Sequence, residues 1–203
     1  PPAIAWIKKK GLTVWASEVD APSLRSKGLN VRALESGEWD VSVEVIPAKH
    51  GPGIVGWLLG AVAGFYMAIE GEPGFYWTGD SVMTPKVKEA IARLSPEVIV
   101  APAGSANFGR GPSILFEEPE LLQLAKLAPG KVIFNHLEAL DHCPTTRDGL
   151  LARLKREGLH ENVFIPRDGE VIEIEQTYSP AKPGVSPRSK PGIQKWVALK
   201  ITG

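Results

Sequence analysis

Residues 74–104 read GFYWTGDSVMTPKVKEAIARLSPEVIVAPAG, and this stretch decides the fold. Its first part, Gly74–Thr78, is rich in aromatic residues and predicts a strand. Lys86–Leu94 spaces its apolar residues as on one face of a helix and predicts an amphipathic helix. Val98–Ala101 is a short apolar run that predicts a buried strand. A strand, a helix and another strand in succession indicate an α/β domain.

The flanking sequence continues this pattern on both sides. Val41–Ile46 alternates apolar and polar residues and predicts a half-buried strand. Gly64–Glu70 and Gly74–Thr78 bracket Glu72-Pro73-Gly74 and predict a hairpin. We further expect helices at 2–9, 21–27, 118–127 and 145–157 and strands at 12–16, 30–34, 131–134, 162–165, 171–175 and 196–201, with turns at 37–38 and 168–169 and a loop or tail over 179–192. Together these elements predict a mixed sheet covered by helices.

Composition excludes several function classes. The chain has 23 Lys and Arg and 23 Asp and Glu, so its formal net charge is zero, and no long run of like charge occurs. This argues against a nucleic-acid or anionic-membrane partner. Ile54–Ile69 is apolar but spans only sixteen residues, fewer than the roughly 20 a membrane helix needs. We expect it to form a buried strand-turn-strand or a short helix.

The cellular compartment is indicated by two features. The single cysteine, Cys143, cannot form an internal disulfide. The lysine cluster that follows Pro1 and Pro2 is unlike a secretory signal. Both features suit a reducing compartment, and we expect the protein to be cytoplasmic.

Three potential metal ligands follow predicted strands. His50 ends VEVIPAKH, Asp80 ends FYWTGD and His136 ends KVIFNH. Strand ends project side chains from a rigid sheet into loops, where functional sites are built. Taken singly, such a histidine is a boundary residue and a Gly-Asp is a turn. Two imidazoles and one carboxylate together suit a borderline cation such as zinc.

The residues around these ligands resemble the metallo-β-lactamase-fold hydrolases. IPAKHG resembles the family's third metal-binding motif, GFYWTGDS its next motif, and KVIFNHLEALDHCPTT its last. SPEVIVAPAG matches a further family strand and its glycine-containing loop, and VFIPRDGEVIEI resembles the closing hairpin. The resemblance runs from Leu12 to Ile174 and is nearest to the branch of ascorbate-6-phosphate lactonase-like proteins.

The resemblance implies an αββα layered sandwich and a metal-dependent hydrolase. It implies two divalent ions, zinc foremost and manganese or iron as alternatives, that generate a hydroxide nucleophile at neutral pH. Asp80 would bridge both ions, while His50 and His136 would each complete one site. The ring nitrogens left free need acceptors, for which Glu138, Asp141 and backbone carbonyls are available.

The chain departs from the family in one respect. Family members carry an upstream HxHxDH segment that supplies the remaining ligands, and no HxHxDH occurs here. We therefore expect residues 1–178 to form the C-terminal two-thirds of the fold and residues 179–203 a Pro-rich tail with an edge strand. Three explanations for the missing N-terminal portion stay open. It was lost by cleavage or is supplied by another chain, or it belongs to the native gene product and is omitted from this sequence. Alternatively, a natural truncation left a non-hydrolytic domain without it.

Other polar residues have both a functional and a structural interpretation. His142 either contacts substrate and donates a proton to the leaving group, or caps the loop before the helix at 145–157. Ser105, Asn107 and Arg110 lie in AGSANFGRG, a loop that either cradles an anionic substrate or is merely flexible. We expect burial for Cys143, a turn-capping role for Ser81 and surface exposure for His160.

Three functions follow as hypotheses. The first is a metal-dependent hydrolase of a small-molecule ester, lactone or phosphoester, with Asp80 and His142 as its catalytic residues. The second is a non-catalytic domain that folds on, or is completed by, a partner. The third is a nuclease-like phosphodiesterase, which the zero net charge disfavours. As partners of the chain we expect a small-molecule substrate and either a second copy in a homo-oligomer or a missing N-terminal segment that completes the fold.

Overall fold

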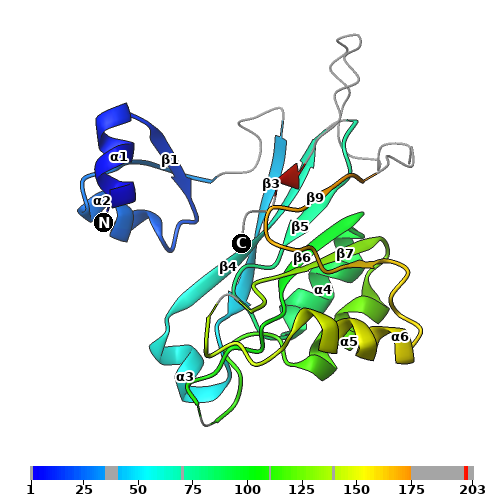
Figure 1. Cartoon of the computed structure of the whole chain (residues 1–203). Coiled ribbons are helices and arrows are strands. Elements are labelled where there is room, and N and C mark those ends of the chain that lie inside the picture. The colour runs from blue at the N-terminus through cyan, green and yellow to red at the C-terminus, as the bar shows by residue number, and fades with distance from the viewer. Residues whose placement is uncertain are drawn as a thin grey trace.

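A six-stranded mixed sheet organises the larger part of the chain in the computed structural model, which describes residues 2–34, 41–69, 71–109, 111–138, 140–174 and 199–200 (Figure 1). The strand order is β3-β4-β5-β6-β7-β8. The strands are β3 (Val41–Lys49), β4 (Ala61–Ile69), β5 (Phe75–Trp77), β6 (Val98–Pro102), β7 (Lys131–Asn135) and β8 (Val163–Phe164). β4 pairs antiparallel with β3 and with β5, and β5, β6, β7 and β8 pair with one another in parallel.

The direction of the strands matters for the site. Because β3 and β5 both run opposite to β4, β3 points the same way as β5, β6, β7 and β8. The carboxyl ends of β3, β5, β6 and β7 therefore lie along one edge of the sheet. The hairpin predicted around Glu72-Pro73-Gly74 is confirmed as the β4–β5 pair.

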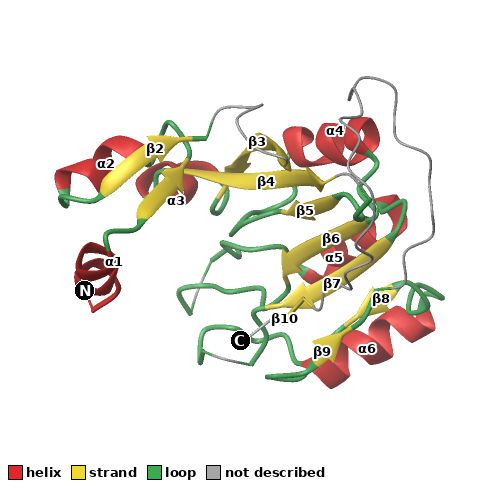
Figure 2. Cartoon of the chain, turned by 90° about the horizontal axis from the view of Figure 1, so that it is seen from above, coloured by secondary structure: helices red, strands yellow, loops and turns green. Residues whose placement is uncertain are grey.

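Three helices cover one face of the sheet (Figure 2). They are α4 (Pro85–Leu94), α5 (Glu118–Leu127) and α6 (Arg147–Arg156). Their apolar side chains form one core with those of the strands, among them the buried Ile91, Leu121, Leu154, Tyr76 and Phe134. β6 is buried along its whole length, as expected of a central strand in a parallel sheet. The prediction of a mixed sheet covered by helices is confirmed.

The opposite face carries a short second layer. β9 (Val171–Ile172) pairs antiparallel with β10 (Leu199–Lys200), and Ile172 packs against Val98, Val100 and Ile133 of the main sheet. The prediction of a hairpin between 162–165 and 171–175 is therefore wrong, because β8 pairs with β7 instead. The turn expected at Gly37-Glu38 and the loop expected over 179–192 lie outside the described residues.

A small N-terminal unit precedes the main sheet. It contains α1 (Pro2–Lys10), β1 (Thr13–Ala16), α2 (Ala21–Ser26) and β2 (Asn30–Ala33), which agrees with the sequence-based expectation. β1 and β2 pair in parallel over a core of four buried residues, Ala16, Ala21, Leu29 and Val31.

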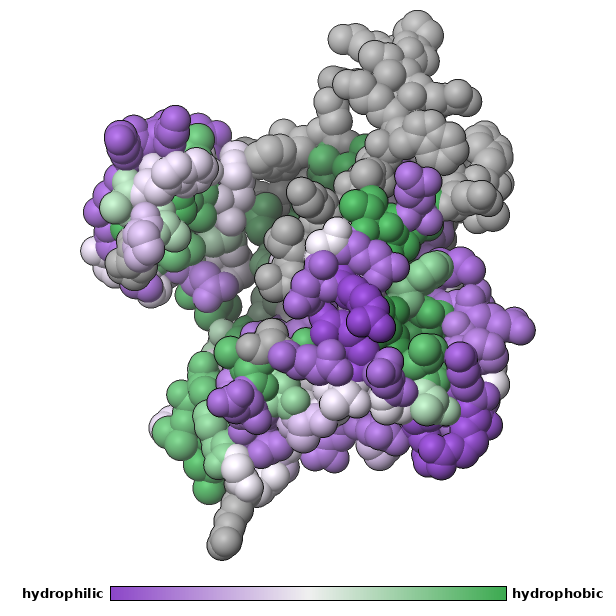
Figure 3. Space-filling model, in the orientation of Figure 1, coloured by the Kyte–Doolittle hydropathy of each residue, from purple (hydrophilic) through white to green (hydrophobic). Residues whose placement is uncertain are grey.

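The apolar run that begins at Ile54 is less buried than predicted. It forms α3 (Gly53–Leu58) followed by β4, and in α3 the Trp57 side chain is 78% exposed. Figure 3 shows apolar residues at this corner of the surface. The helix is only six residues long and turns Val55 towards the neighbouring cluster of Ala106 and Ile114. Within the described residues, no helix combines the length and apolar character needed to span a bilayer.

Candidate metal centre

The three predicted ligands follow strands that end at the same edge of the sheet. His50 follows β3 directly, Asp80 comes three residues after β5, and His136 follows β7 directly. Because these strands point the same way, their loops share the carboxyl edge. His50 and His136 are partly buried, whereas Asp80 is exposed.

Backbone and hydroxyl contacts join the His50 and Asp80 loops. The Val82 N–H donates to the Lys49 carbonyl at 2.9 Å, and the Lys49 N–H donates to Ser81 Oγ at 3.3 Å. Ser81 is fully buried, and its hydroxyl also donates to the Val82 carbonyl at 2.8 Å, so it joins the two loops; a turn-capping role for Ser81 stays a prediction. His50 and Asp80 are therefore each one residue from a contact that links their loops.

The glycine before Asp80 is required by its surroundings. Gly79 has φ +64°, and a Cβ at this position would lie 2.5 Å from the Ala63 carbonyl oxygen of β4. A side chain would be strained by the backbone conformation and would collide with the neighbouring strand. The Gly-Asp pair thus turns the chain away from the sheet immediately before the carboxylate.

His136 has a sulfur partner. Its Nδ1 lies 3.7 Å from Cys143 Sγ, and which atom donates depends on the imidazole tautomer. The acceptors expected from the sequence were Glu138 and Asp141, but the Glu138 carboxylate is engaged by Arg147 and Asp141 is exposed. If the sulfur accepts from Nδ1–H, Nε2 of His136 is left free to act as a ligand.

Cys143 is buried, as predicted. Burial raises the pKa of the Cys143 thiol, and the negative charge of Asp80 raises it further. The thiol is therefore neutral near pH 7.

A close approach of backbone holds the next loop against this pair. A Cβ on Gly104 would lie 2.4 Å from the His136 carbonyl oxygen and 2.9 Å from both Cβ and Sγ of Cys143. The Thr145 N–H donates to the Gly104 carbonyl at 3.3 Å, and the Ala103 N–H donates to the Asn135 carbonyl at 2.8 Å. The loops after β6 and β7 are thus packed together with no room for a side chain.

The predicted ligands fit a metal in chemistry but do not form a closed site. Imidazole and carboxylate donors suit a borderline divalent ion. In the part of the chain that the structure describes, no three His, Cys, Asp or Glu side chains are close enough together to hold one. His50, Asp80 and His136 are brought to one edge without a complete coordination shell.

The predicted substrate loop is held by internal hydrogen bonds. Ser105 Oγ donates to the Phe116 carbonyl at 3.0 Å and accepts from Thr145 Oγ1 at 2.8 Å. Asn107 Oδ1 accepts from the Gly109 N–H at 2.9 Å. Arg110 lies outside the described residues. These bonds give the loop a defined shape, and substrate contact by Ser105, Asn107 and Arg110 stays a prediction.

The two remaining histidines are exposed. The His142 carbonyl accepts from the Asn107 N–H at 3.0 Å, so its backbone holds the neighbouring loop while its side chain faces solvent. Its predicted role with substrate stays a prediction. His160 is exposed beyond α6, in agreement with its expected surface position.

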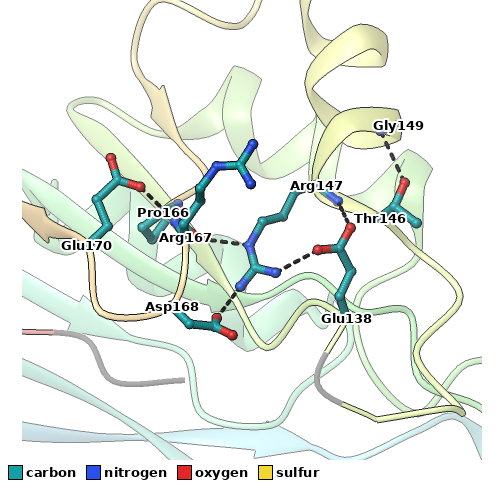
Figure 4. A network of polar contacts seen from close by, with 8 residues as sticks. All are labelled: Glu138, Thr146, Arg147, Gly149, Pro166, Arg167, Asp168 and Glu170. Carbon is teal, nitrogen blue, oxygen red and sulfur yellow. Dashed lines mark hydrogen bonds and ion pairs between the residues drawn. The ribbon is translucent and has the colours of Figure 1, made fainter.

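Sequence reasoning missed a cluster around Arg147 (Figure 4). The guanidinium of Arg147 binds the carboxylates of Glu138 and Asp168 and the carbonyl of Pro166. Arg147 is the first residue of α6, where the helix dipole disfavours a positive charge. An arginine at the first position of a predicted helix is the signal in the sequence that could have indicated acidic partners for its side chain.

A cavity of about 410 Å³ lies behind the His50 and Asp80 loops. Its lining includes Lys49, Val82 and Glu120, and burial raises the pKa of the Glu120 carboxyl. Both Glu120 oxygens accept backbone N–H groups, from Met83 and Glu117. None of the three predicted ligands lines this cavity, which is therefore separate from the candidate site.

Known proteins similar to this chain include one curated relative and several solved structures. No protein-family profile matches the chain. The chain is similar to the UPF0173 protein YddR of Bacillus subtilis, with 28% identity over 160 residues that cover 76% of the chain and 63% of YddR. The chain thus spans less than two-thirds of the length of this relative.

Solved structures are similar over most of the chain. The metallo-β-lactamase fold protein YhfI from Bacillus subtilis matches with a TM-score of 0.54 and 11% identity over 80% of the chain and 66% of YhfI. The chain has the metallo-β-lactamase fold. An isothiocyanate hydrolase from Delia radicum gut bacteria matches with a TM-score of 0.71 and 25% identity, covering 78% of the chain and 66% of that protein. A possible metal-dependent hydrolase from Veillonella parvula matches with a TM-score of 0.70 and 26% identity, covering 78% of the chain and 65% of that protein.

Proposed function

We propose that the chain belongs to a metal-dependent hydrolase that cleaves a small-molecule ester, lactone or phosphoester. The observation that carries the proposal is the placement of His50, Asp80 and His136 after three strands that end at one edge of the sheet. The similarity to an isothiocyanate hydrolase and to a possible metal-dependent hydrolase supports it.

His50, Asp80 and His136 would hold up to two divalent ions, of which zinc suits the donors best and manganese or iron are alternatives. A bound divalent ion would lower the pKa of water to about 7 and so supply a nucleophile at neutral pH. His136 would coordinate through Nε2, because Nδ1 faces Cys143. Three side chains do not fill two coordination shells, so the remaining ligands would come from other residues of the whole protein.

A second candidate is a non-catalytic domain that a partner completes. The specific observation in its favour is that no three ligand-type side chains converge among the described residues. The two functions differ in their expected response to metal. The hydrolase requires it, whereas the non-catalytic domain has no activity that chelation could remove.

The test is a hydrolysis assay with chelation and replacement of the metal. p-Nitrophenyl esters, a panel of lactones and p-nitrophenyl phosphoesters are incubated with protein that has been treated with EDTA and then supplied with Zn²⁺, Mn²⁺ or Fe²⁺. We expect EDTA and Asp80→Ala each to abolish turnover of at least one class, and one of the metals to restore it after EDTA. The control His160→Ala changes an exposed histidine and should leave turnover intact.

Turnover that survives EDTA and Asp80→Ala would refute the hydrolase proposal. Absence of turnover with every metal and every class would favour the non-catalytic domain. Cleavage of an added single-stranded DNA substrate that falls steeply with salt would instead favour the nuclease-like alternative, because binding to a phosphate backbone releases counterions.

A further inference from the structure

The segment that carries His136 has an unusual backbone. His136 and Glu138 have φ values of +56° and +59°, although neither is glycine. Non-glycine residues persist in this region only where surrounding contacts impose the conformation. Leu137, between them, is buried in the core under the helices. Contacts on both sides of His136 are therefore needed to hold its imidazole in one place.

Arg147 supplies the contact on the Glu138 side. Its backbone N–H donates to Glu138 Oε1 at 2.9 Å, and its Nη1 donates to Glu138 Oε2 at 2.6 Å. Both carboxylate oxygens are thus bound by one residue.

The same guanidinium is anchored to a third segment. Nε donates to the Pro166 carbonyl at 2.9 Å, and Nη2 donates to Asp168 Oδ1 at 2.5 Å (Figure 4). The turn that carries these acceptors is itself closed by the Arg167 N–H, which donates to Glu170 Oε2 at 2.7 Å. The Arg147 side chain is only 18% exposed, so it lies inside the cluster rather than over it.

We propose that Arg147 is a positioning residue for His136. Through Glu138 it fixes the strained segment after β7 against the 166–168 turn and so holds His136 in place at the edge of the sheet. This inference rests on the proposed function, because it treats His136 as a metal ligand. Arg147 itself touches neither His136 nor a reacting group.

The position of Arg147 argues against an ordinary surface ion pair. Arg147 begins α6, where its charge opposes the helix dipole, so helix stability does not explain its presence. Arg153 on the same helix offers a comparison. It pairs with Glu118 at 3.5 Å and with Glu157 at 3.2 Å, and its side chain is 36% exposed. Neither partner of Arg153 belongs to a loop at the carboxyl edge.

The experiment compares Arg147→Ala with the matched control Arg153→Ala. Zn²⁺ affinity is measured by competition with a chromophoric chelator, and stability is measured by urea unfolding. Loss of a group hydrogen-bonded to a metal ligand weakens metal binding about 10- to 100-fold, and because Arg147 acts one step further away, through Glu138, we take the lower limit of about 10-fold. We expect that loss in Arg147→Ala and a change within about twofold in Arg153→Ala. Equal Zn²⁺ affinity in the two variants would overturn the proposal.

A metal-free measurement separates this proposal from the proposed function. Amide hydrogen exchange of residues 136–147 should accelerate in Arg147→Ala and stay unchanged in Arg153→Ala. If wild-type protein binds no Zn²⁺, the hydrolase proposal fails, and the exchange result alone decides whether Arg147 holds the segment. Should Arg147→Ala not fold, Arg147→Lys and Asp168→Asn each remove one part of the cluster, and unchanged exchange in both would also overturn the proposal.

Discussion

The close packing behind His136 allows a test in which stability and function separate. Replacing Gly104 with alanine would place a Cβ 2.4 Å from the His136 carbonyl oxygen, about 1 Å short of ordinary van der Waals contact. Neither loop can easily yield, because Ala103 and Asn135 are joined by a 2.8 Å hydrogen bond one residue away. Gly104 does not have a positive φ, so the collision alone causes the effect.

The magnitude follows from this overlap. Overpacking a well-packed site costs about 1–3 kcal/mol, and we expect Gly104→Ala to lower the free energy of unfolding by about 2 kcal/mol. We expect His136 and Cys143 to move, because their atoms lie nearest to the added Cβ. A displacement of about 1 Å in a positioned group costs roughly 100-fold in rate. We therefore expect a loss of that order in metal-dependent hydrolysis, with weakened Zn²⁺ binding.

Gly130→Ala is the matched control. Its Cβ would lie 2.2 Å from the Glu97 carbonyl oxygen, an equally severe overlap, at the start of β7 rather than at its end. Urea unfolding should show similar losses of stability in both variants. Zn²⁺ titration and hydrolysis should be impaired in Gly104→Ala alone. If both variants bind Zn²⁺ as the wild type does, the packing around His136 does not position a metal ligand and the reasoning is refuted.

Three further predictions concern single groups. Tyr76 is fully buried, and its hydroxyl has no hydrogen-bond partner among the described residues. Tyr76→Phe should therefore raise the free energy of unfolding, measured in urea, by about 1 kcal/mol. A lower free energy of unfolding in the variant would show that the hydroxyl is hydrogen-bonded. Burial raises the pKa of Glu120 in the folded state. The protonated carboxyl therefore stabilises the fold fully at a pH below the pKa of the unfolded state, and this contribution is lost as the pH rises through the pKa of the folded state. Stability measured from pH 4 to 7 should therefore fall more for the wild type than for Glu120→Gln, and parallel curves would contradict this assignment. Because burial and Asp80 raise the pKa of Cys143, iodoacetamide should modify the native thiol at pH 7 far more slowly than the unfolded one, whereas equal rates would show an exposed or ionised thiol.

The regular elements were predictable because their signals are local. α5 was predicted with the bounds that the structure shows, since apolar spacing and the Pro129-Gly130 turn define it within one segment. Thr146 caps α6 through its hydroxyl, which accepts from the Gly149 N–H at 3.2 Å, and threonine is a residue type favoured at that position. The placement of three ligand-type residues after strands also required only the local pattern.

Pairing and exposure were less predictable, because they depend on what lies opposite. The alternation in β9 does not show whether its partner is β8 or β10, and the more common local hairpin was the wrong choice. The hydropathy of α3 likewise does not tell whether another surface covers Trp57. Both outcomes are set by segments distant in the sequence.

The surroundings of the candidate site were the hardest part to predict. The contact between Cys143 and His136 spans seven residues, and the bonds of Arg147 reach both back to Glu138 and forward to Asp168. The backbone at His136 and Glu138 also has positive φ, although neither residue is the glycine that would have signalled it in the sequence. Side-chain partners in irregular loops are therefore visible only once the backbone path is known.

Zn²⁺ titration of single-ligand variants tests the central claim most directly. Calorimetry or chelator competition on His50→Ala, Asp80→Ala and His136→Ala should each show weaker binding than the wild type. His160→Ala, which changes a histidine exposed away from this edge, should bind Zn²⁺ as the wild type does. Zn²⁺ affinity that is the same in the wild type and in all three ligand variants would contradict a metal centre at the carboxyl edge of the sheet.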